Sequence, residues 1–241
     1  MLLSVSVICL DLLNLGSQIR LLEQMGVDRL HIDLVDGHFS SNLGLPLYLL
    51  PQLRTFSHLP IDVHLMVANP EMYFSYLIEH GVDLICVHLE SIRHQGERMA
   101  ASICQAGVSF GLAISPDTEV DYELIHRLNP SKVTVVTVRP GFKGQTFIKE
   151  SLETIRSLTS TRDEGQFILE ADGAVGPETI PQLIEAGCQS LVIGSTIFGD
   201  GKDVQGTLAN LQNILGSSEN CVVTHDSPAY YVSRGVLCSD H

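Results

Sequence analysis

A short polar segment stands out near residue 32, where His31 and Asp33 lie two positions apart at the end of an apolar run. In a β-strand, residues i and i+2 point to the same face, so an imidazole and a carboxylate would project side by side. An acidic side chain buried at the end of an apolar strand is costly unless it is paired or bound to a metal ion. The segment therefore predicts a functional site at this strand end.

Two other candidate strands carry partners of the same kind. His64 lies near the end of one apolar run, and Asp172 ends another. Two imidazoles and two carboxylates suit a borderline divalent metal ion such as zinc, manganese, cobalt or ferrous iron. The sequence therefore predicts one divalent metal ion held by a set of four residues, His31, Asp33, His64 and Asp172.

The two aspartates of this set, Asp33 and Asp172, can also move protons. Carboxylates on opposite sides of a substrate carbon could remove a proton from one face and return one to the other. The metal would stabilise the oxyanion that forms when a proton leaves the carbon beside a carbonyl. Metal binding also lowers the basicity of a carboxylate, so the gain in rate must come from stabilising the enediolate. We expect Asp33 and Asp172 to be the catalytic pair.

A loop over residues 138–145 follows another candidate strand and contains two cations, Arg139 and Lys143, together with Gly141 and Gly144. Small residues also follow the last two candidate strands, Gly173 after the first of them and Gly194 and Ser195 after the second. In α/β barrels, loops at these places often bind phosphate through backbone N–H groups and a helix N-terminus. These loops predict a phosphate site.

Short apolar runs alternate with amphipathic stretches along the chain, and several runs are rich in Val and Ile, as is typical of parallel strands buried on both faces. The candidate strands are 3–9, 29–34, 61–67, 84–89, 109–114, 132–138, 167–171 and 190–193. The candidate helices lie near 13–26, 44–55, 70–80, 92–106, 120–128, 147–161, 177–187 and 204–215. Strict alternation of eight strands and eight helices predicts a closed (β/α)8 TIM barrel, with a doubly wound open sheet as the alternative.

The end of the chain departs from this alternation. No linker divides the first part of the sequence, so we expect one barrel domain over residues 1–216. Residues 217–241 contain short β-prone pieces around a proline. They predict a C-terminal extension of unknown role, either a disordered tail or a lid on a neighbouring subunit.

Composition excludes several classes of partner. The 241-residue chain has a formal net charge of -14, which argues against nucleic acid or an anionic membrane surface. No apolar run reaches the roughly 18 residues of a membrane span. The six cysteines form no C-x-x-C pair, and the N-terminus lacks the basic region of a signal peptide. We therefore expect a cytoplasmic protein with reduced cysteines, in which local donors must hold any anionic substrate.

Five motifs, in order along the chain, resemble the ribulose-phosphate 3-epimerase family of ketose-phosphate 3-epimerases. H-x-D-x-M-D-G-x-F corresponds to residues 31–39, D-x-H-x-M-V to 62–67, H-x-E to 88–90, V-x-P-G-F-x-G-Q to 138–145 and G-S to 194–195. The resemblance covers about residues 4–198. It implies a (β/α)8 isomerase with one divalent metal ion, a homo-oligomer that interconverts D-ribulose 5-phosphate and D-xylulose 5-phosphate. The proton transfer at C3 would use Asp33 and Asp172 and pass through an enediolate.

The resemblance, together with the loops described above, indicates where a small phosphorylated ketose would bind. Ser6 matches the family's substrate-contacting serine, and Met66 remains from a soft apolar cover over the reacting carbon. The expected substrate contacts are Ser6, His64, Met66, Gly141, Lys143, Gly144, Gln145, Gly173, Gly194 and Ser195.

Several positions depart from the family pattern, among them residues 40–41 and Arg139. Val35 and Val136 replace methionines, and Lys143 and Ala174 replace glycines. Smaller side chains over the reacting carbon leave room for a larger sugar, so an allulose-6-phosphate 3-epimerase is an alternative. A non-catalytic sugar-phosphate-binding protein is a further alternative, although it would not need two acid/base carboxylates. An aldolase or decarboxylase of the same barrel group is disfavoured, because the aspartate–lysine motif of those enzymes is missing after Asp33.

Overall fold

The computed structural model describes residues 1–92, 95–142, 144–198 and 203–216. Eight parallel strands pair in chain order, and the last pairs with the first, so the sheet closes into a barrel. The strands are β1 (Leu2–Ser6), β2 (Arg29–Val35), β3 (Ile61–Met66), β4 (Leu84–His88), β5 (Ser109–Ile114), β6 (Lys132–Val136), β7 (Ile168–Asp172) and β8 (Ser190–Ile193). The expected (β/α)8 barrel is confirmed, and the open sheet is excluded.

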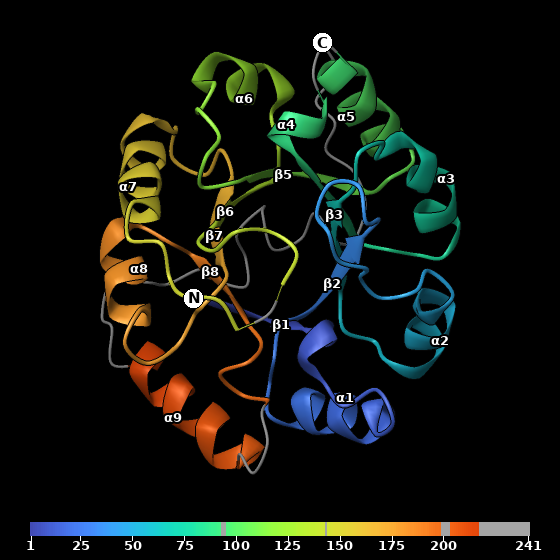
Figure 1. Cartoon of the computed structure of the whole chain (residues 1–241), viewed down its shortest axis with the longest axis vertical. Helices are drawn as coiled ribbons and strands as arrows, with labels where there is room; N and C mark the ends of the chain where they lie inside the picture. The colour runs from blue at the N-terminus through green and yellow to red at the C-terminus, as the bar shows by residue number, and fades with distance from the viewer. Residues whose placement is uncertain (93–94, 143, 199–202, 217–241) are drawn as a thin grey trace.

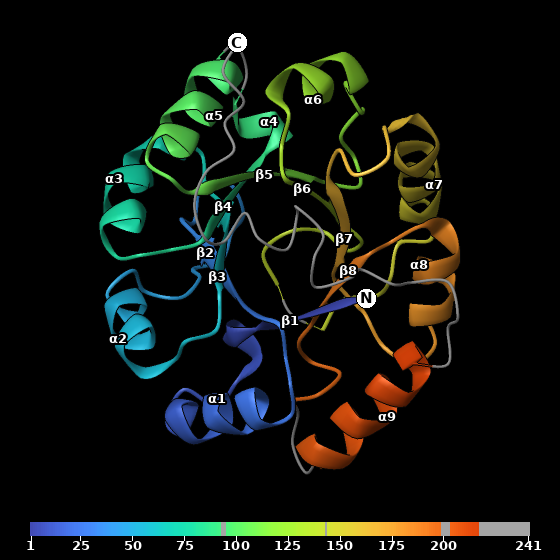
Figure 2. The ribbon, with the colours of Figure 1, turned by 180° about the vertical axis from the view of Figure 1, so that it is seen from behind.

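Helices form a ring around the barrel (Figure 1), and the view from behind shows the same ring (Figure 2). They are α1 (Leu15–Gln24), α2 (Leu49–Phe56), α3 (Glu71–Glu79), α4 (Leu89–Ile92), α5 (Gly96–Gln105), α6 (Tyr122–Leu128), α7 (Ser151–Thr161), α8 (Ile180–Ala186) and α9 (Val204–Gly216), with a 3-10 turn, η1 (Val7–Cys9), after β1.

Several element boundaries differ from the sequence-based expectation, and three of these differences change the description of an element. The first strand ends at Ser6, where its pairing with β2 ends, and the next three residues form η1 instead. The helix expected from residue 44 begins at Leu49, because the backbone N–H groups of Gly44 and Leu45 bond to the end of β2. The helix expected over residues 92–106 is replaced by α4 and α5.

Side chains alternate between two environments along each strand. In β2, Leu30, Ile32 and Leu34 are buried in the core between strands and helices. Because strand side chains have a period of two, His31 and Asp33 project into the barrel instead. The barrel interior therefore holds polar side chains together with a smaller apolar cluster that includes Leu84 and Cys86, and the larger apolar core lies between the strands and the helices.

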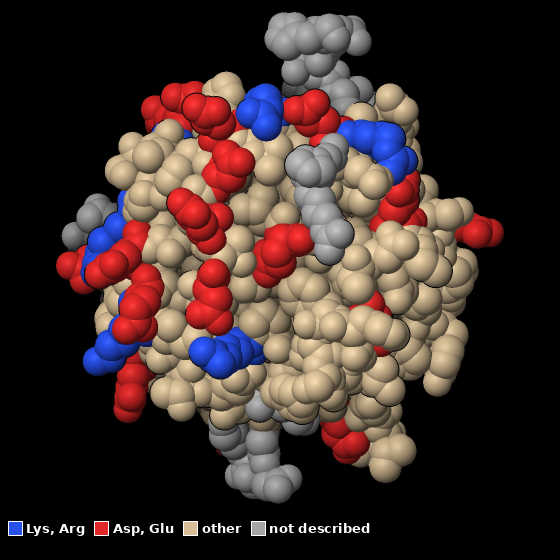
Figure 3. Space-filling view, turned by 45° about the horizontal axis from the view of Figure 1, so that its top comes forward, with Lys and Arg blue, Asp and Glu red and all other residues tan. Residues whose placement is uncertain are grey.

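Charge is spread unevenly over the surface. Acidic side chains are scattered over the upper and left parts of the face in Figure 3, and its lower right part has few charged side chains. No described helix is long and apolar enough to cross a membrane. The four described cysteines, Cys9, Cys86, Cys104 and Cys188, form no disulfide bond with one another. The expected extension, residues 217–241, lies outside the described residues, so the division into a barrel domain and an extension stays a prediction.

Candidate active site and metal centre

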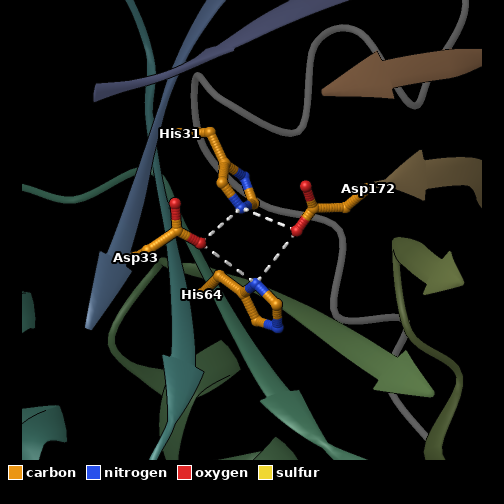
Figure 4. Close-up of side chains that lie close together, drawn as sticks. All are labelled: His31, Asp33, His64 and Asp172. Atoms are coloured by element: carbon orange, nitrogen blue, oxygen red, sulfur yellow. Dashed lines mark ion pairs between the residues drawn. The ribbon is translucent and has the colours of Figure 1, made fainter. Parts of the chain in front are cut away.

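The four residues predicted as metal ligands come together inside the barrel mouth (Figure 4). His31 and Asp33 lie on β2, His64 on β3, and Asp172 ends β7. His31 Nε2 is 3.4 Å from Asp33 Oδ1 and 3.6 Å from Asp172 Oδ2. His64 Nδ1 is 3.4 Å from each of the same two oxygens. Imidazoles and carboxylates therefore alternate around a small ring of donor atoms.

This cluster has the size and chemistry of a divalent metal site. Its four donor atoms lie within 4.8 Å of one another. Donors about 2.0–2.1 Å from a tetrahedral metal ion are about 3.3–3.4 Å apart, close to the distances measured around the ring. His31 Nε2 and His64 Nδ1 are buried and hydrogen-bond to no described residue. Among the described residues, these two nitrogens face only the carboxylates of Asp33 and Asp172. The cluster could therefore hold a metal ion.

Electrostatics in the cluster couples the four groups. Burial alone would lower the pKa of both histidines, but the carboxylates of Asp33 and Asp172 raise the pKa of His31 and His64. Burial would likewise raise the pKa of each aspartate, but the neighbouring imidazoles hold the pKa of Asp33 and Asp172 below the usual range. In the metal-free cluster the histidines therefore bind protons that a metal ion must displace.

We expect the metal affinity to fall as the pH is lowered. Coordination needs the imidazole lone pairs, and protons compete for them up to the raised pKa values of His31 and His64. Calorimetric titration with zinc, in buffers of different ionisation enthalpy, should show proton release on zinc binding, and the release should grow as the pH is lowered. Zinc binding without proton release would contradict the raised pKa values.

A buried charged network lies next to His31 inside the barrel. His31 Nδ1 is 3.3 Å from Asp62 Oδ2. Lys132 Nζ donates to Asp62 and also to Glu170 Oε1, at 2.6 Å for the second contact. Ser190 donates to the other Glu170 oxygen at 2.7 Å. Burial would lower the pKa of Lys132, but the two carboxylates raise it. A carboxylate behind a metal-binding histidine fixes its tautomer and orientation, and Asp62 occupies that place behind His31.

A cavity that is partly open to solvent lies at the barrel mouth beside the cluster. Of the expected substrate contacts, it is lined by Ser6, His64, Met66, Gly141, Gly144, Gln145, Gly173, Gly194 and Ser195, with the aspartates Asp33 and Asp172. Lys143, the remaining expected contact, lies outside the described residues. His31 is fully buried and is not among the lining residues. The strand ends and loops chosen from the sequence thus border one cavity.

Asp33 is held in place from two directions. Ser6 donates to Asp33 Oδ2 at 2.6 Å, which leaves Oδ1 facing the two imidazoles. The backbone of β2 is braced by Gly44, whose N–H bonds to Val35 O at 3.0 Å. A Cβ atom at Gly44 would come within 2.5 Å of the Asp33 carbonyl oxygen, so only glycine fits this close approach.

Comparison with known proteins decides the family. The model of the Ribulose-phosphate 3 epimerase family matches residues 2–198. The chain belongs to this family. A ribulose-phosphate 3-epimerase of Bacillus subtilis (strain 168) is 36% identical over 199 residues, covering 80% of this chain and 90% of that protein. The cytoplasmic isoform of ribulose-phosphate 3-epimerase from Oryza sativa subsp. japonica is 34% identical over 215 residues, covering 88% and 93%.

A solved structure agrees with the fold. The 3-keto-L-gulonate-6-phosphate decarboxylase from Vibrio cholerae O1 superposes with a TM-score of 0.66 at 12% sequence identity, covering 89% of this chain and 97% of that one. At this identity the likeness concerns the barrel alone. With the family established by sequence, the chain is an isomerase of the epimerase class.

Three of the positions at which this epimerase departs from the family pattern line the cavity. Val35, Val136 and Ala174 are all lining residues. Arg139, a cation of the loop over residues 138–145, does not face the cavity. The side chain of Arg139 is 76% exposed and lies 3.9 Å from Asp117, and Arg139 is not a lining residue. Arg139, although it belongs to the loop expected to bind phosphate, therefore lies outside the cavity.

Ala174 adopts a backbone conformation that favours glycine, with φ of +49°. An L-residue in the left-handed region costs about 1–2 kcal/mol, and glycine loses about 0.5–1 kcal/mol more than alanine in chain entropy on folding. We therefore expect Ala174→Gly to raise the free energy of unfolding slightly, by about 1 kcal/mol or less. Urea unfolding of the metal-free protein would measure this change.

A matched control exists at Ala106, which is exposed and has φ of −81°. Ala106→Gly relieves no strain and should lower the free energy of unfolding. Equal losses of stability in the two variants would contradict strain at Ala174.

Sequence reasoning missed several residues of this site. Ile8, Cys9, Phe142 and Val192 also line the cavity. Cys9 was assigned to an extended strand, and only the turn η1 brings it to the cavity. Phe142 was within the expected loop and could have been included. The network of Asp62, Lys132 and Glu170 had one signal in the sequence, a charged residue within each of three apolar strands.

Proposed function

We propose that this epimerase interconverts D-ribulose 5-phosphate and D-xylulose 5-phosphate with one divalent metal ion, zinc, ferrous iron, manganese or cobalt. One observation carries the proposal. Asp33 and Asp172 enter one cavity from strands three apart in the closed barrel, and each places an oxygen beside the same two imidazoles. The names of the relatives from Bacillus subtilis and rice support this pair of sugars.

The proposed reaction is a two-base proton transfer. One carboxylate of the pair Asp33 and Asp172 is ionised and takes the proton from C3, next to the carbonyl, and the electron pair of the C–H bond passes into the enediolate. The other carboxyl group starts protonated and gives a proton to the opposite face of C3, which inverts its configuration. When bound by His31, His64 and the two aspartates, the metal ion supplies stabilisation of the negative charge on the enediolate. Ser6 orients Asp33 through its hydrogen bond.

The phosphate of the substrate is proposed to bind at the loops after β6, β7 and β8. Gly144 has φ of +77° and Gly173 has φ of +114°, conformations in which successive backbone N–H groups can form an anion-binding concavity. Gly194 and Ser195 border the same cavity. Gln145 donates its side-chain amide to Phe142 O at 3.0 Å, so we assign it to bracing this loop as well as lining the cavity.

A ketohexose 6-phosphate, such as allulose 6-phosphate, is the second candidate substrate. Val35 and Val136 line the cavity at positions where the family pattern has the longer methionine. The space between them favours a substrate with one more carbon. The non-catalytic alternative has no such support, because family membership and the paired carboxylates both favour an enzyme.

We also propose a cytoplasmic homo-oligomer. The rice relative is named as a cytoplasmic isoform. Large apolar side chains are exposed on successive segments after β1, β2 and β3, with Leu13 at 94%, Leu43 at 73% and Met72 at 77% exposure. Such side chains support contact with a second copy. Sedimentation equilibrium measurements of the full chain would test this, and a monomer at micromolar concentration would contradict it.

Product analysis tests the proposed activity. The protein, loaded in turn with each of the four metals, is incubated with ribulose 5-phosphate and separately with allulose 6-phosphate, and products are followed by NMR. We expect conversion of ribulose 5-phosphate with the higher kcat/KM, and loss of both reactions on chelation. A higher kcat/KM for allulose 6-phosphate would favour the second candidate. No conversion of either sugar by metal-loaded protein would overturn the proposal.

A further inference from the structure

A chain of hydrogen bonds leads from His64 away from the cavity. His64 Nε2 lies 2.8 Å from Nε2 of His88, the last residue of β4. On its other side, His88 Nδ1 lies 3.0 Å from Glu90 Oε1. Ser115, just after β5, donates to the same Glu90 oxygen. The sequence motif H-x-E was noticed at 88–90, but its contact with His64 was not predicted.

The two imidazoles meet nitrogen to nitrogen. Their centroids are 4.9 Å apart and their planes differ by 18°. Two imidazoles joined by an N–H···N bond of 2.8 Å in one plane would have centroids about 5 Å apart. The rings of His64 and His88 are therefore nearly coplanar, with the lone pair of one Nε2 aimed at the other, and the ring of Phe39 packs 4.5 Å from His88 on another side.

Only one proton fits between these two nitrogens, and its place determines the tautomer of both rings. When His64 carries it on Nε2, the lone pair of its Nδ1 is free for the metal ion, whose positive charge would offset the carboxylates of Asp33 and Asp172. His88 then accepts at Nε2, so its own proton is on Nδ1, where Glu90 Oε1 can accept it. In the opposite arrangement, His88 Nδ1 would face the carboxylate of Glu90 with a lone pair, which is repulsive.

We infer that His88, held by Glu90, is a positioning residue that fixes His64 in the tautomer whose Nδ1 is free to bind the metal. Neither His88 nor Glu90 lines the cavity, and His88 is fully buried, so neither is placed to touch the substrate. The inference rests on the proposed metal site. His64 would thus be oriented by His88, just as His31 is oriented by a different residue, Asp62.

The first test compares two substitutions at one position. In His88→Gln the amide oxygen can accept from His64 Nε2, whereas in His88→Leu no acceptor remains. Partners behind a metal-binding histidine change metal affinity by about 10–100-fold, so we expect His88→Leu to weaken zinc binding by this factor and His88→Gln to recover most of it. A chromophoric chelator competition measures the affinity, and the visible spectrum of the cobalt-loaded proteins reports a changed ligand set.

His80→Leu is the matched control, because His80 is a partly buried histidine on the outer surface that bonds to Tyr76 O at 2.8 Å. It should leave the zinc affinity unchanged. A second measurement needs no substitution. Long-range 1H–15N NMR of the zinc-loaded wild-type protein should show His64 protonated on Nε2 and His88 on Nδ1.

The outcomes separate the two claims. Wild-type protein that binds no zinc would overturn the proposed metal site itself. Zinc binding by wild-type protein that is unchanged in His88→Leu, or a His88 protonated on Nε2, would overturn this inference and leave the metal site standing.

Discussion

Asp172→Asn should abolish epimerisation but leave Asp33 able to exchange the C3 proton from its own side of the substrate. Asparagine keeps the shape and an oxygen donor but cannot act as acid or base, so we expect turnover to fall by about 10²–10⁴-fold or more. The two epimers carry the C3 hydrogen on opposite sides, so Asp33 can exchange it only in the epimer whose C3 hydrogen points toward Asp33. In D2O, NMR should therefore show exchange at C3 of one epimer of the sugar phosphate only, and the other epimer should exchange in Asp33→Asn.

Two controls keep this result interpretable. Both aspartates are also proposed metal ligands, so metal content must be measured and the assay run at saturating metal. Asp117→Asn provides a matched loss of charge at an aspartate that is 80% exposed and outside the cavity, and it should keep normal turnover. Near-normal turnover in Asp172→Asn, or exchange of both epimers by it, would contradict the two-base mechanism.

Lys132→Met should destabilise the fold more than any surface substitution. The side chain of Lys132 is 1% exposed and contacts Asp62 and Glu170, which are both fully buried. Removing one partner of a buried ion pair costs about 3–5 kcal/mol, because an uncompensated charge is left inside the protein. Here two carboxylates lose their shared cation, and Arg29, at 3.9 Å from Asp62, is the nearest described substitute. Urea unfolding of the metal-free protein measures the loss.

The comparison variants are Arg98→Met and a triple substitution. Arg98 pairs with Glu71 on the surface, where the two side chains are 59% and 40% exposed, and its loss should cost less than about 1 kcal/mol. The triple variant Lys132→Met, Asp62→Asn, Glu170→Gln removes all three charges together and should recover much of the lost stability. A cost at Lys132 no larger than that at Arg98 would show that the network contributes little.

The sequence was sufficient to predict the barrel and the four side chains that come together in the candidate metal site. Strand periodicity places His31 and Asp33 on one face, and the rule that barrel strands direct their C-terminal ends to one mouth brings His64 and Asp172 to the same place. The shorter first strand could not be foreseen, because Val and Ile favour strands locally. Its end is set instead by where pairing with β2 stops.

The supporting contacts required the coordinates. Lys132 opens an apolar strand, where a lysine at a solvent-exposed strand end is the ordinary expectation, and its partners come from β3 and β7. His88 was expected at a strand end, but a motif does not state how its ring lies relative to His64. The orientation of Arg139 also required the coordinates. It belongs to a loop predicted to bind phosphate, but its side chain turns outward to solvent.

Deuterium exchange at C3 tests the central claim most directly. The metal-loaded protein is incubated in D2O with ribulose 5-phosphate, and separately with allulose 6-phosphate, and C3 is followed by NMR. We expect deuterium to enter C3 of ribulose 5-phosphate rapidly, and we expect chelation of the metal to stop the exchange. Absence of exchange in both sugars, with protein shown to hold its metal, would contradict the enediolate mechanism and favour a sugar-phosphate-binding protein on an epimerase barrel.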